Sequence, residues 1–303
     1  MNKFTYSLVA GTFAVLGFAH SGDAAAASNW DLITSCNPSP VQGAYTAGGN
    51  TVSCATGVPS ETITATAWSS AGSGISNGNF IRASMGDFTG GIGAYSGSGE
   101  TNTDAQHAFD NVTASCGSAT VGVGGCGGAQ EFMLINFGPY KVNLTAMSIG
   151  FFGTDADVAI LRWDGADMTS AAMSTLLSGK NTSNFTTGTG WSLVGTESLG
   201  PLVSGSDTTT VGLGSQVSSW WIVSTYYGTA AASTLGSLNT GDDRFKISAL
   251  AGNVCTSGNY IGGNQGNGGT CGPGTVPEPG SLALIAAAML GVTVSRRRFV
   301  GRR

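Results

Sequence analysis

Short runs of β-forming residues, separated by turn residues, recur along most of the chain and limit its fold more than any other feature. Of the 303 residues 49 are glycine, and Ser, Thr, Asn and Asp are mixed with them between the apolar runs. This pattern is typical of strands joined by tight turns. In residues 131–137 both faces are apolar, as in the central strand of a sandwich. We predict strands at residues 62–68, 131–137, 146–152, 158–163, 192–196, 208–213, 219–226 and 244–250.

One stretch breaks the β pattern. Residues 168–178 place apolar side chains at helical spacing, with Asp167 expected as the N-cap and Gly179 just beyond the end. The apolar stripe is narrow, so we expect this helix to pack over a sheet edge. The expected fold class is all-β, a single β-sandwich domain with one short helix.

The N-terminal residues have the three parts of an export signal. Lys3 supplies a positive start, residues 4–18 are mostly apolar, and Asp23 is followed by four alanines that suit cleavage. We expect a signal peptide over residues 1–27, cleaved near Ala25 to Ala27, and export by Sec-type machinery.

The six cysteines form three couples along the chain. In an exported protein an even number of cysteines indicates disulfides. Many pairings are possible, and neighbour pairing closes the shortest loops; it joins Cys36 with Cys54, Cys116 with Cys126, and Cys255 with Cys271. A zinc site is the competing interpretation, but no C-x-x-C pair and no histidine accompany these residues.

The charge of the exported part is acidic. Lys3 and five C-terminal arginines account for six of the 12 basic residues, and Asp23 for one of the 17 acidic ones, which leaves a net charge of about −10. This charge argues against nucleic acid or an anionic membrane surface as a partner.

The C-terminal end combines three features. A turn of Pro277, Glu278 and Pro279 precedes an apolar run over residues 282–294, and a basic tail follows, made of Arg296, Arg297, Arg298, Arg302 and Arg303. Thirteen residues give roughly 20 Å of helix, short of the ~30 Å hydrocarbon core. The arginines hold their end of this hydrophobic helix in the cytoplasm. A simple tail anchor is the alternative interpretation.

This arrangement resembles the PEP-CTERM sorting signal, which exosortases recognise. The resemblance implies a precursor held briefly in the inner membrane, cleavage by an exosortase, and delivery to the cell surface or extracellular matrix, with exopolysaccharide as a candidate partner. The Gly-rich residues 262–276 are expected to be a linker between a domain of residues 28–261 and a sorting signal of residues 277–303.

A second resemblance covers roughly residues 105–252. Its parts look like the pattern of the exosortase-dependent surface protein group and lie at residues 106–111, 131–152, 153–165, 218–228 and 242–252. Their order is also similar to discoidin-type jelly rolls, which bind sugars through loops. The resemblance implies a jelly-roll-like sandwich.

Residues with catalytic or ligand-binding chemistry are few. His107 is the only histidine after the leader, which leaves little for a histidine-based catalytic site, and we expect neither catalytic residues nor a resident cofactor. Asp155 and Asp157 are candidate Ca²⁺ ligands, and solvated turn aspartates are the alternative. Trp220 and Trp221 must point to opposite faces of a strand. We expect one of them to enter the core and the other to cover a neighbouring strand, with a platform for sugar stacking as the alternative.

The sequence therefore predicts an exported, non-enzymatic protein of the cell envelope or extracellular matrix. A carbohydrate- or Ca²⁺-binding jelly-roll module is the first alternative. An envelope glycoside hydrolase that uses two carboxylates is the second.

Overall fold

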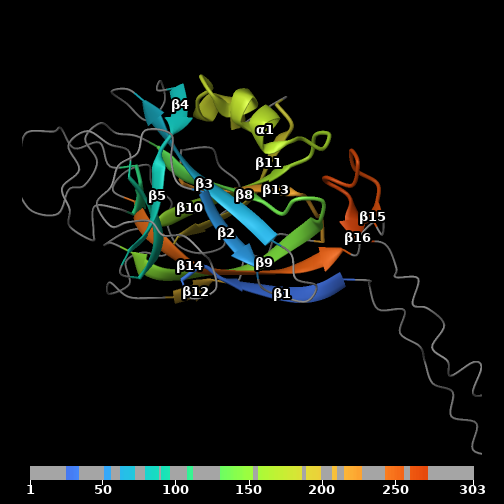
Figure 1. The fold of residues 1–303 in the computed structure, drawn as a ribbon, viewed down its shortest axis with the longest axis horizontal. Coiled ribbons are helices and arrows are strands. Elements are labelled where there is room, and N and C mark those ends of the chain that lie inside the picture. The colour runs from blue at the N-terminus through green and yellow to red at the C-terminus, as the bar shows by residue number, and fades with distance from the viewer. Residues whose placement is uncertain are drawn as a thin grey trace, which may run out of the picture. The chain divides into compact units, whose positions relative to one another are not determined.

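Two antiparallel β-sheets face one another in the computed structural model, and a helix covers one of them (Figure 1). The structure describes residues 25–33, 51–55, 62–71, 79–88, 90–95, 108–111, 130–152, 156–185, 189–198, 207–209, 215–226, 243–255 and 260–271. All of them belong to one unit, Asp23–Gly274. The predicted all-β sandwich is therefore confirmed.

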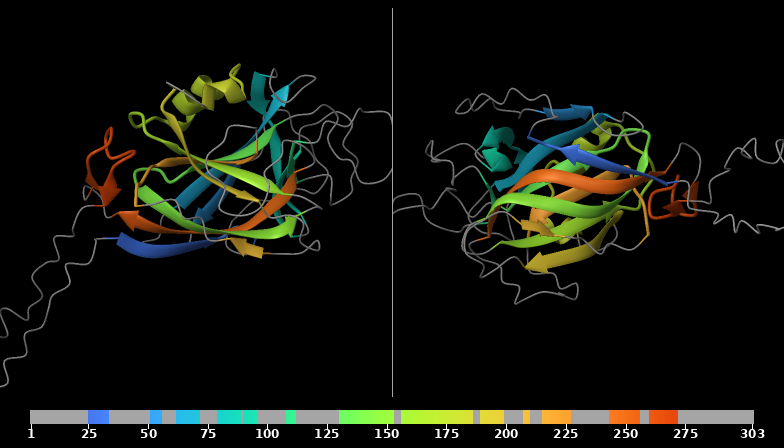
Figure 2. Two further views of the ribbon diagram at one scale, coloured as in Figure 1. Left: turned by 180° about the vertical axis from the view of Figure 1, so that it is seen from behind. Right: turned by 90° about the horizontal axis from the view of Figure 1, so that it is seen from below.

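The first sheet is organised around its longest strands, β9 (Lys141–Phe152) and β14 (Arg244–Cys255). On one edge β9 pairs with β12 (Asp207–Thr209). On the other edge β14 pairs in turn with β7 (Phe109–Asp110), β6 (Gly91–Tyr95) and β1 (Ala25–Asp31), and β6 pairs with β5 (Ser84–Phe88). Figure 2 shows β1, β14 and β9 side by side when the sheet is seen from below.

The second sheet has the order β11 (Trp191–Ser198), β10 (Asp157–Trp163), β13 (Trp220–Thr225), β8 (Glu131–Asn136) and β3 (Thr62–Ala71). The free edge of β3 is shared by β2 (Thr51–Ala55) and β4 (Asn79–Arg82). A separate hairpin, β15 (Tyr260–Ile261) and β16 (Thr270–Cys271), lies at one end of the sandwich.

Side-chain alternation on the second sheet creates two apolar layers. Met133 of β8 and Trp221 of β13 lie in the core between the sheets, whereas Phe132 and Trp220 lie in a second cluster on the outer face. The 3₁₀ helix η2 (Thr182–Phe185) and helix α1 (Ser170–Leu177) contribute Phe185, Met173 and Leu177 to that outer cluster. The helix therefore covers the face of the sheet, and the expectation that it packs over an edge was wrong.

The helix ends differ from the prediction at one side only. The hydroxyl oxygen of Thr169, not Asp167, caps the N-terminus by accepting a hydrogen bond from the Ala172 N–H at 3.2 Å. At the other end Gly179 follows the helix with φ +74°, as its sequence position indicated. Asp167 has another role, described below.

The eight predicted strands all coincide with observed ones, although residues 210–213 lie outside the described part of the chain. Strands β1, β2, β4 to β7, β15 and β16 were not predicted, and β1 includes Ala25 to Ala27, which were assigned to the leader. Within the described residues no helix is both long and apolar enough to cross a membrane. The rest of the leader and the sorting signal lie outside those residues.

The buried carboxyl group of Glu197, in β11, makes the stability of the fold depend on pH. Glu197 is 6% exposed, one of its carboxylate oxygens has no hydrogen-bond partner among the described residues, and burial raises its pKa. A raised folded-state pKa means that the fold binds this proton more tightly than the unfolded chain does, so protonation at low pH stabilises the fold.

We therefore expect Glu197→Gln, which removes the buried charge, to raise the free energy of unfolding at neutral pH. The advantage over the wild type should shrink as the pH falls through the raised folded-state pKa. Urea unfolding at neutral and at acid pH measures both. An equal difference at the two pH values would contradict the assignment.

Candidate functional site

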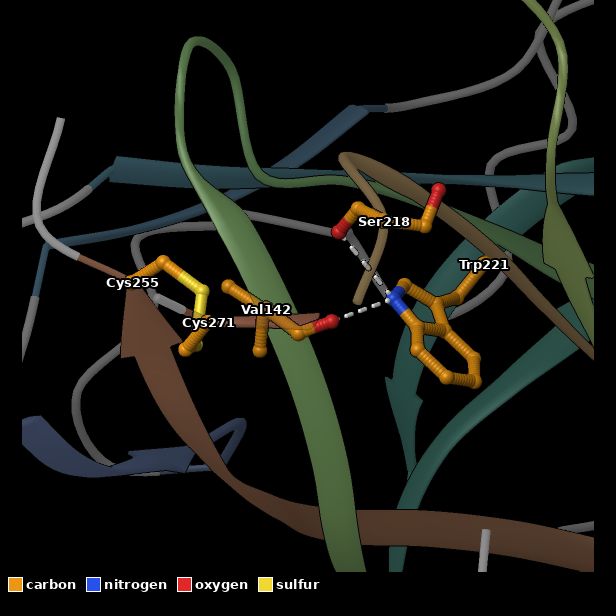
Figure 3. The surroundings of a disulfide bond; sticks show 5 residues. All are labelled: Val142, Ser218, Trp221, Cys255 and Cys271. Atoms are coloured by element: carbon orange, nitrogen blue, oxygen red, sulfur yellow. Dashed lines mark hydrogen bonds between the residues drawn. A yellow bond between two sulfur atoms is a disulfide. The ribbon is translucent and has the colours of Figure 1, made fainter. Parts of the chain in front are cut away.

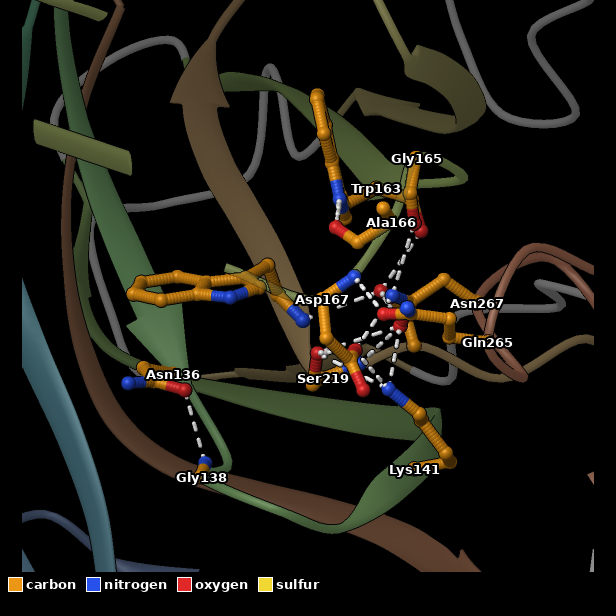
Figure 4. Close-up of polar contacts among 12 residues, drawn as sticks. Asn136, Gly138, Lys141, Trp163, Gly165, Ala166, Asp167, Ser219, Gln265 and Asn267 are labelled. Carbon is orange, nitrogen blue, oxygen red and sulfur yellow. Dashed lines mark hydrogen bonds and ion pairs between the residues drawn. The ribbon is translucent and has the colours of Figure 1, made fainter. Parts of the chain in front are cut away.

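The turn between β15 and β16 docks on one end of the sandwich and completes a cluster of polar side chains (Figure 4). We call Lys141, Asp167, Ser218, Ser219 and Asn267 the Asn267 cluster. They come from the start of β9, the loop between β10 and α1, the segment before β13, and the hairpin turn. Residues far apart in the sequence therefore meet at this end.

Asn267 lies at the centre of the cluster and is fully buried. Its Oδ1 accepts from the Ser219 backbone N–H at 2.9 Å and from Lys141 Nζ at 3.1 Å, and the hydroxyl groups of Ser218 and Ser219 each lie 3.2 Å away. Its Nδ2 donates to the Gly165 carbonyl at 2.9 Å and to Asp167 Oδ1 at 2.8 Å. Both ends of the amide are therefore hydrogen-bonded, as burial requires.

Lys141 is a buried amine that needs these partners. Its side chain is 2% exposed, and Nζ forms an ion pair with Asp167, whose side chain is 47% exposed. The Tyr260 ring lies over the ammonium, 6.0 Å from it. An unpaired charge at this depth would be strongly destabilising. Asp167 thus neutralises the amine and connects the cluster to solvent.

Strand pairing and a turn explain where Lys141 lies. The β8–β9 turn is held by the Asn136 side chain, which accepts from the Gly138 N–H at 2.8 Å. Lys141 then pairs opposite Cys255 at the end of β14. Cys255 is joined to Cys271 of β16, so the lysine lies beside the base of the hairpin.

Glycine permits the tight hairpin turn. Gly266 has φ +88°, and a Cβ there would lie 2.5 Å from the Tyr260 ring. Gly268 has φ +74°, and a Cβ there would lie 2.8 Å from a carboxylate oxygen of Asp164. Only glycine meets both demands. The prediction of a linker over residues 262–276 was therefore wrong as far as Cys271, because this stretch folds onto the sandwich.

The hairpin turn also determines the role of Asp167. The Gln265 side chain accepts a hydrogen bond from the Asp167 N–H at 2.7 Å. This contact and the ion pair with Lys141 hold Asp167 two residues before Thr169, outside the helix. Asp167 is therefore not the N-cap, because its carboxylate is directed to the lysine.

A second ion pair, between Arg162 and Asp164, lies against the hairpin turn. Arg162 is 4% exposed, and its Nε and Nη2 contact the two carboxylate oxygens of Asp164 at 2.7 and 3.2 Å. The Ser192 hydroxyl donates to the same carboxylate. This two-point pairing fixes Asp164, against which Gly268 packs.

The disulfide between Cys255 and Cys271 confirms one of the three predicted pairs (Figure 3). Its Cα atoms are 5.4 Å apart. Beside it the fully buried Trp221 donates from Nε1 to the carbonyls of Val142 and Ser218, at 3.1 and 3.2 Å. Cys36, Cys116, Cys126 and the side chain of Cys54 lie outside the described residues.

Residues from several parts of the second resemblance form another polar site, where β7 and β13 end and β10 and β14 begin. Asn111 donates to the Tyr226 carbonyl at 3.1 Å and to the Asp243 carboxylate, and Asp243 also accepts from the Asp157 N–H at 2.6 Å. Asn111, Asp157 and Asp243 are all fully buried. Asn111 and Asp243 thus tie the ends of separate strands together.

The calcium prediction gains no geometric support from these residues. Asp157 lies in the buried interior, and its expected partner Asp155 is outside the described residues, as is His107. Within the described ranges no three His, Cys, Asp or Glu side chains are arranged to hold a metal ion.

The two adjacent tryptophans do point to opposite faces, and both are buried. Trp220 is 3% exposed under the helix layer, and Trp221 is fully buried between the sheets. Neither offers a free ring face on which a sugar could stack.

Removal of the disulfide tests how firmly the hairpin is held. The double variant Cys255→Ser/Cys271→Ser opens a loop with a sequence separation of 16 residues. We expect it to lower the free energy of unfolding by about 3 kcal/mol. Urea unfolding of the variant and of the wild type measures the loss. An unchanged free energy would show that the disulfide adds no constraint beyond the Asn267 cluster.

Comparisons with known proteins identify the C-terminal end. A family model described as the PEP-CTERM protein-sorting motif matches residues 275–298, a range that includes Pro277, Glu278, Pro279, Arg296, Arg297 and Arg298. No curated protein and no solved structure matches the chain. The chain therefore carries a PEP-CTERM sorting signal at its C-terminal end, and this signal marks it as an exosortase-targeted surface protein.

Proposed function

We propose that the protein is exported, cleaved by an exosortase at its C-terminal signal, and displayed at the cell surface or in the extracellular matrix as a non-enzymatic structural protein. The observation that carries this proposal is the PEP-CTERM motif over residues 275–298, which begins four positions after Cys271. In the sequence, the signal thus follows closely after the hairpin. The inner membrane holds the precursor only until cleavage.

The construction of the domain near this signal supports a structural role. The last described residues before the signal in the sequence form a hairpin that is held by a disulfide and by the Asn267 cluster. In that cluster the amide of Asn267 and the carboxylate of Asp167 are occupied with internal partners. A hairpin held in this way suits a structural protein that is attached through its C-terminal end and must resist force applied there.

The other candidate functions make different predictions. A carbohydrate- or Ca²⁺-binding module would show saturable binding on glycan arrays or in calorimetry with Ca²⁺, and an exopolysaccharide would be the natural ligand in the matrix. A glycoside hydrolase would show turnover that is lost when one carboxylate pair is changed.

The intact mass of the protein recovered from its host tests the sorting proposal. We expect a chain that lacks the leader and ends near Pro279. In a host without exosortase, and in the variant Glu278→Ala, we expect the basic end up to Arg303 to be retained. Retention of Arg303 in the wild type, with exosortase present, would leave a tail-anchored protein in place of a sorted one.

A further inference from the structure

The Asn267 cluster places an amine next to the carbonyl of an amide. Lys141 Nζ lies 3.1 Å from Asn267 Oδ1, and Oδ1 is only about 1.23 Å from the carbonyl carbon Cγ. Lys141 is 2% exposed and Asn267 is fully buried, so bulk water is excluded from both side chains. The fold therefore holds the nucleophile on β9 next to the electrophile in the hairpin turn, and no chance encounter is needed.

The carbonyl of Asn267 lies among hydrogen-bond donors. The Ser219 backbone N–H donates to Oδ1 at 2.9 Å, and the hydroxyls of Ser218 and Ser219 lie 3.2 Å from it. If Cγ is attacked, negative charge develops on Oδ1. The fixed Ser219 N–H at this position stabilises that charge in the way an oxyanion-hole donor does.

Asp167 contacts both nitrogen atoms that must exchange protons. Its Oδ1 pairs with Lys141 Nζ and accepts from Asn267 Nδ2 at 2.8 Å. One carboxylate oxygen therefore reaches the group that must lose protons and the group that must leave. This is the geometry required of a shared general base and acid.

We propose that Lys141 and Asn267 join in an intramolecular isopeptide bond, with Asp167 as the proton carrier. Asp167 takes a proton from the Lys141 ammonium, and the free amine attacks Cγ of Asn267. The Nζ–Cγ bond forms and the Cγ–Nδ2 bond breaks, while Asp167 passes protons from Nζ to Nδ2. Nδ2 leaves as ammonia, which takes up the remaining proton as ammonium. The reaction requires no oxidant and no cofactor.

The bond would act as a covalent clamp at the attachment end of the domain. It would join the first residue of β9 to the hairpin turn, four residues before Cys271. The disulfide and the isopeptide bond would then hold the same hairpin to two neighbouring strands, and only the disulfide would depend on redox conditions. Pulling on the C-terminal end would not peel the hairpin from the sandwich.

The intact mass of the full protein from its host, measured after reduction of the disulfides, tests the proposal. We expect the wild type to be lighter than its processed sequence by one ammonia. We expect Lys141→Arg, which keeps the positive charge but offers no free amine, and Asp167→Asn to have the full mass. Digestion of the wild type should give a branched peptide that joins Lys141 to Asn267.

Two other reactions would give distinguishable results. Asn267 precedes Gly268, and this pair can lose ammonia by forming a backbone succinimide; that loss would persist in Lys141→Arg and would overturn the proposal. Loss of water in place of ammonia would place the bond at Asp167 and would also overturn it. A wild type of full mass that trypsin cleaves after Lys141 would show that the cluster is held by hydrogen bonds alone, whatever the stability of the variants.

Discussion

The buried amide of Asn267 is the contact on which one whole end of the sandwich depends. Val142 of the first sheet exchanges backbone hydrogen bonds with Ser218, at the entry to the second sheet. Gly268 and Gly269 exchange backbone hydrogen bonds with Val217 in the same segment. Asn267 adds the side-chain contacts that join this segment to β9 and to the β10–α1 loop. Without Asn267, Lys141 would keep its ion pair with Asp167. Both side chains would lose the amide to which they are hydrogen-bonded and which holds them in position.

Basic residues are scarce in the domain, and two of them lie at this end. Only six basic residues lie between the leader and the tail: Arg82, Lys141, Arg162, Lys180, Arg244 and Lys246. Two of them, Lys141 and Arg162, are buried at the hairpin end, each with an aspartate from the loop between β10 and α1. A buried ion pair fixes position more than it adds stability, because desolvation offsets most of the attraction. These pairs therefore determine how the loop and the hairpin fit together.

The sheets were predictable from sequence where strand patterning is strong. β8 and β13 are apolar on both faces because each lies between a core and a helix-covered outer layer, and that pattern is visible in the residues themselves. The short edge strands were missed because they carry little periodic signal, and β1 was hidden by its likeness to a cleavage site. The Gly-rich hairpin was mistaken for a linker, since composition does not separate flexible glycines from glycines held at positive φ. The Asn267 cluster could not be predicted at all, because its members are up to 126 residues apart and meet only through sheet topology.

Amide hydrogen exchange at the hairpin tests most directly whether residues 260–271 close the sandwich. The N–H groups of Val217 and Gly268 bond to the carbonyls of Gly269 and Val217, each at 2.8 Å, and the Ser219 N–H bonds to Asn267. If the hairpin is part of the fold, these amides exchange as slowly as those in the middle of β13, because exposing them requires the sandwich to open. Exchange at the rate of an unstructured chain at Gly268, with β13 still protected, would show that the Gly-rich segment is a linker and would contradict the account.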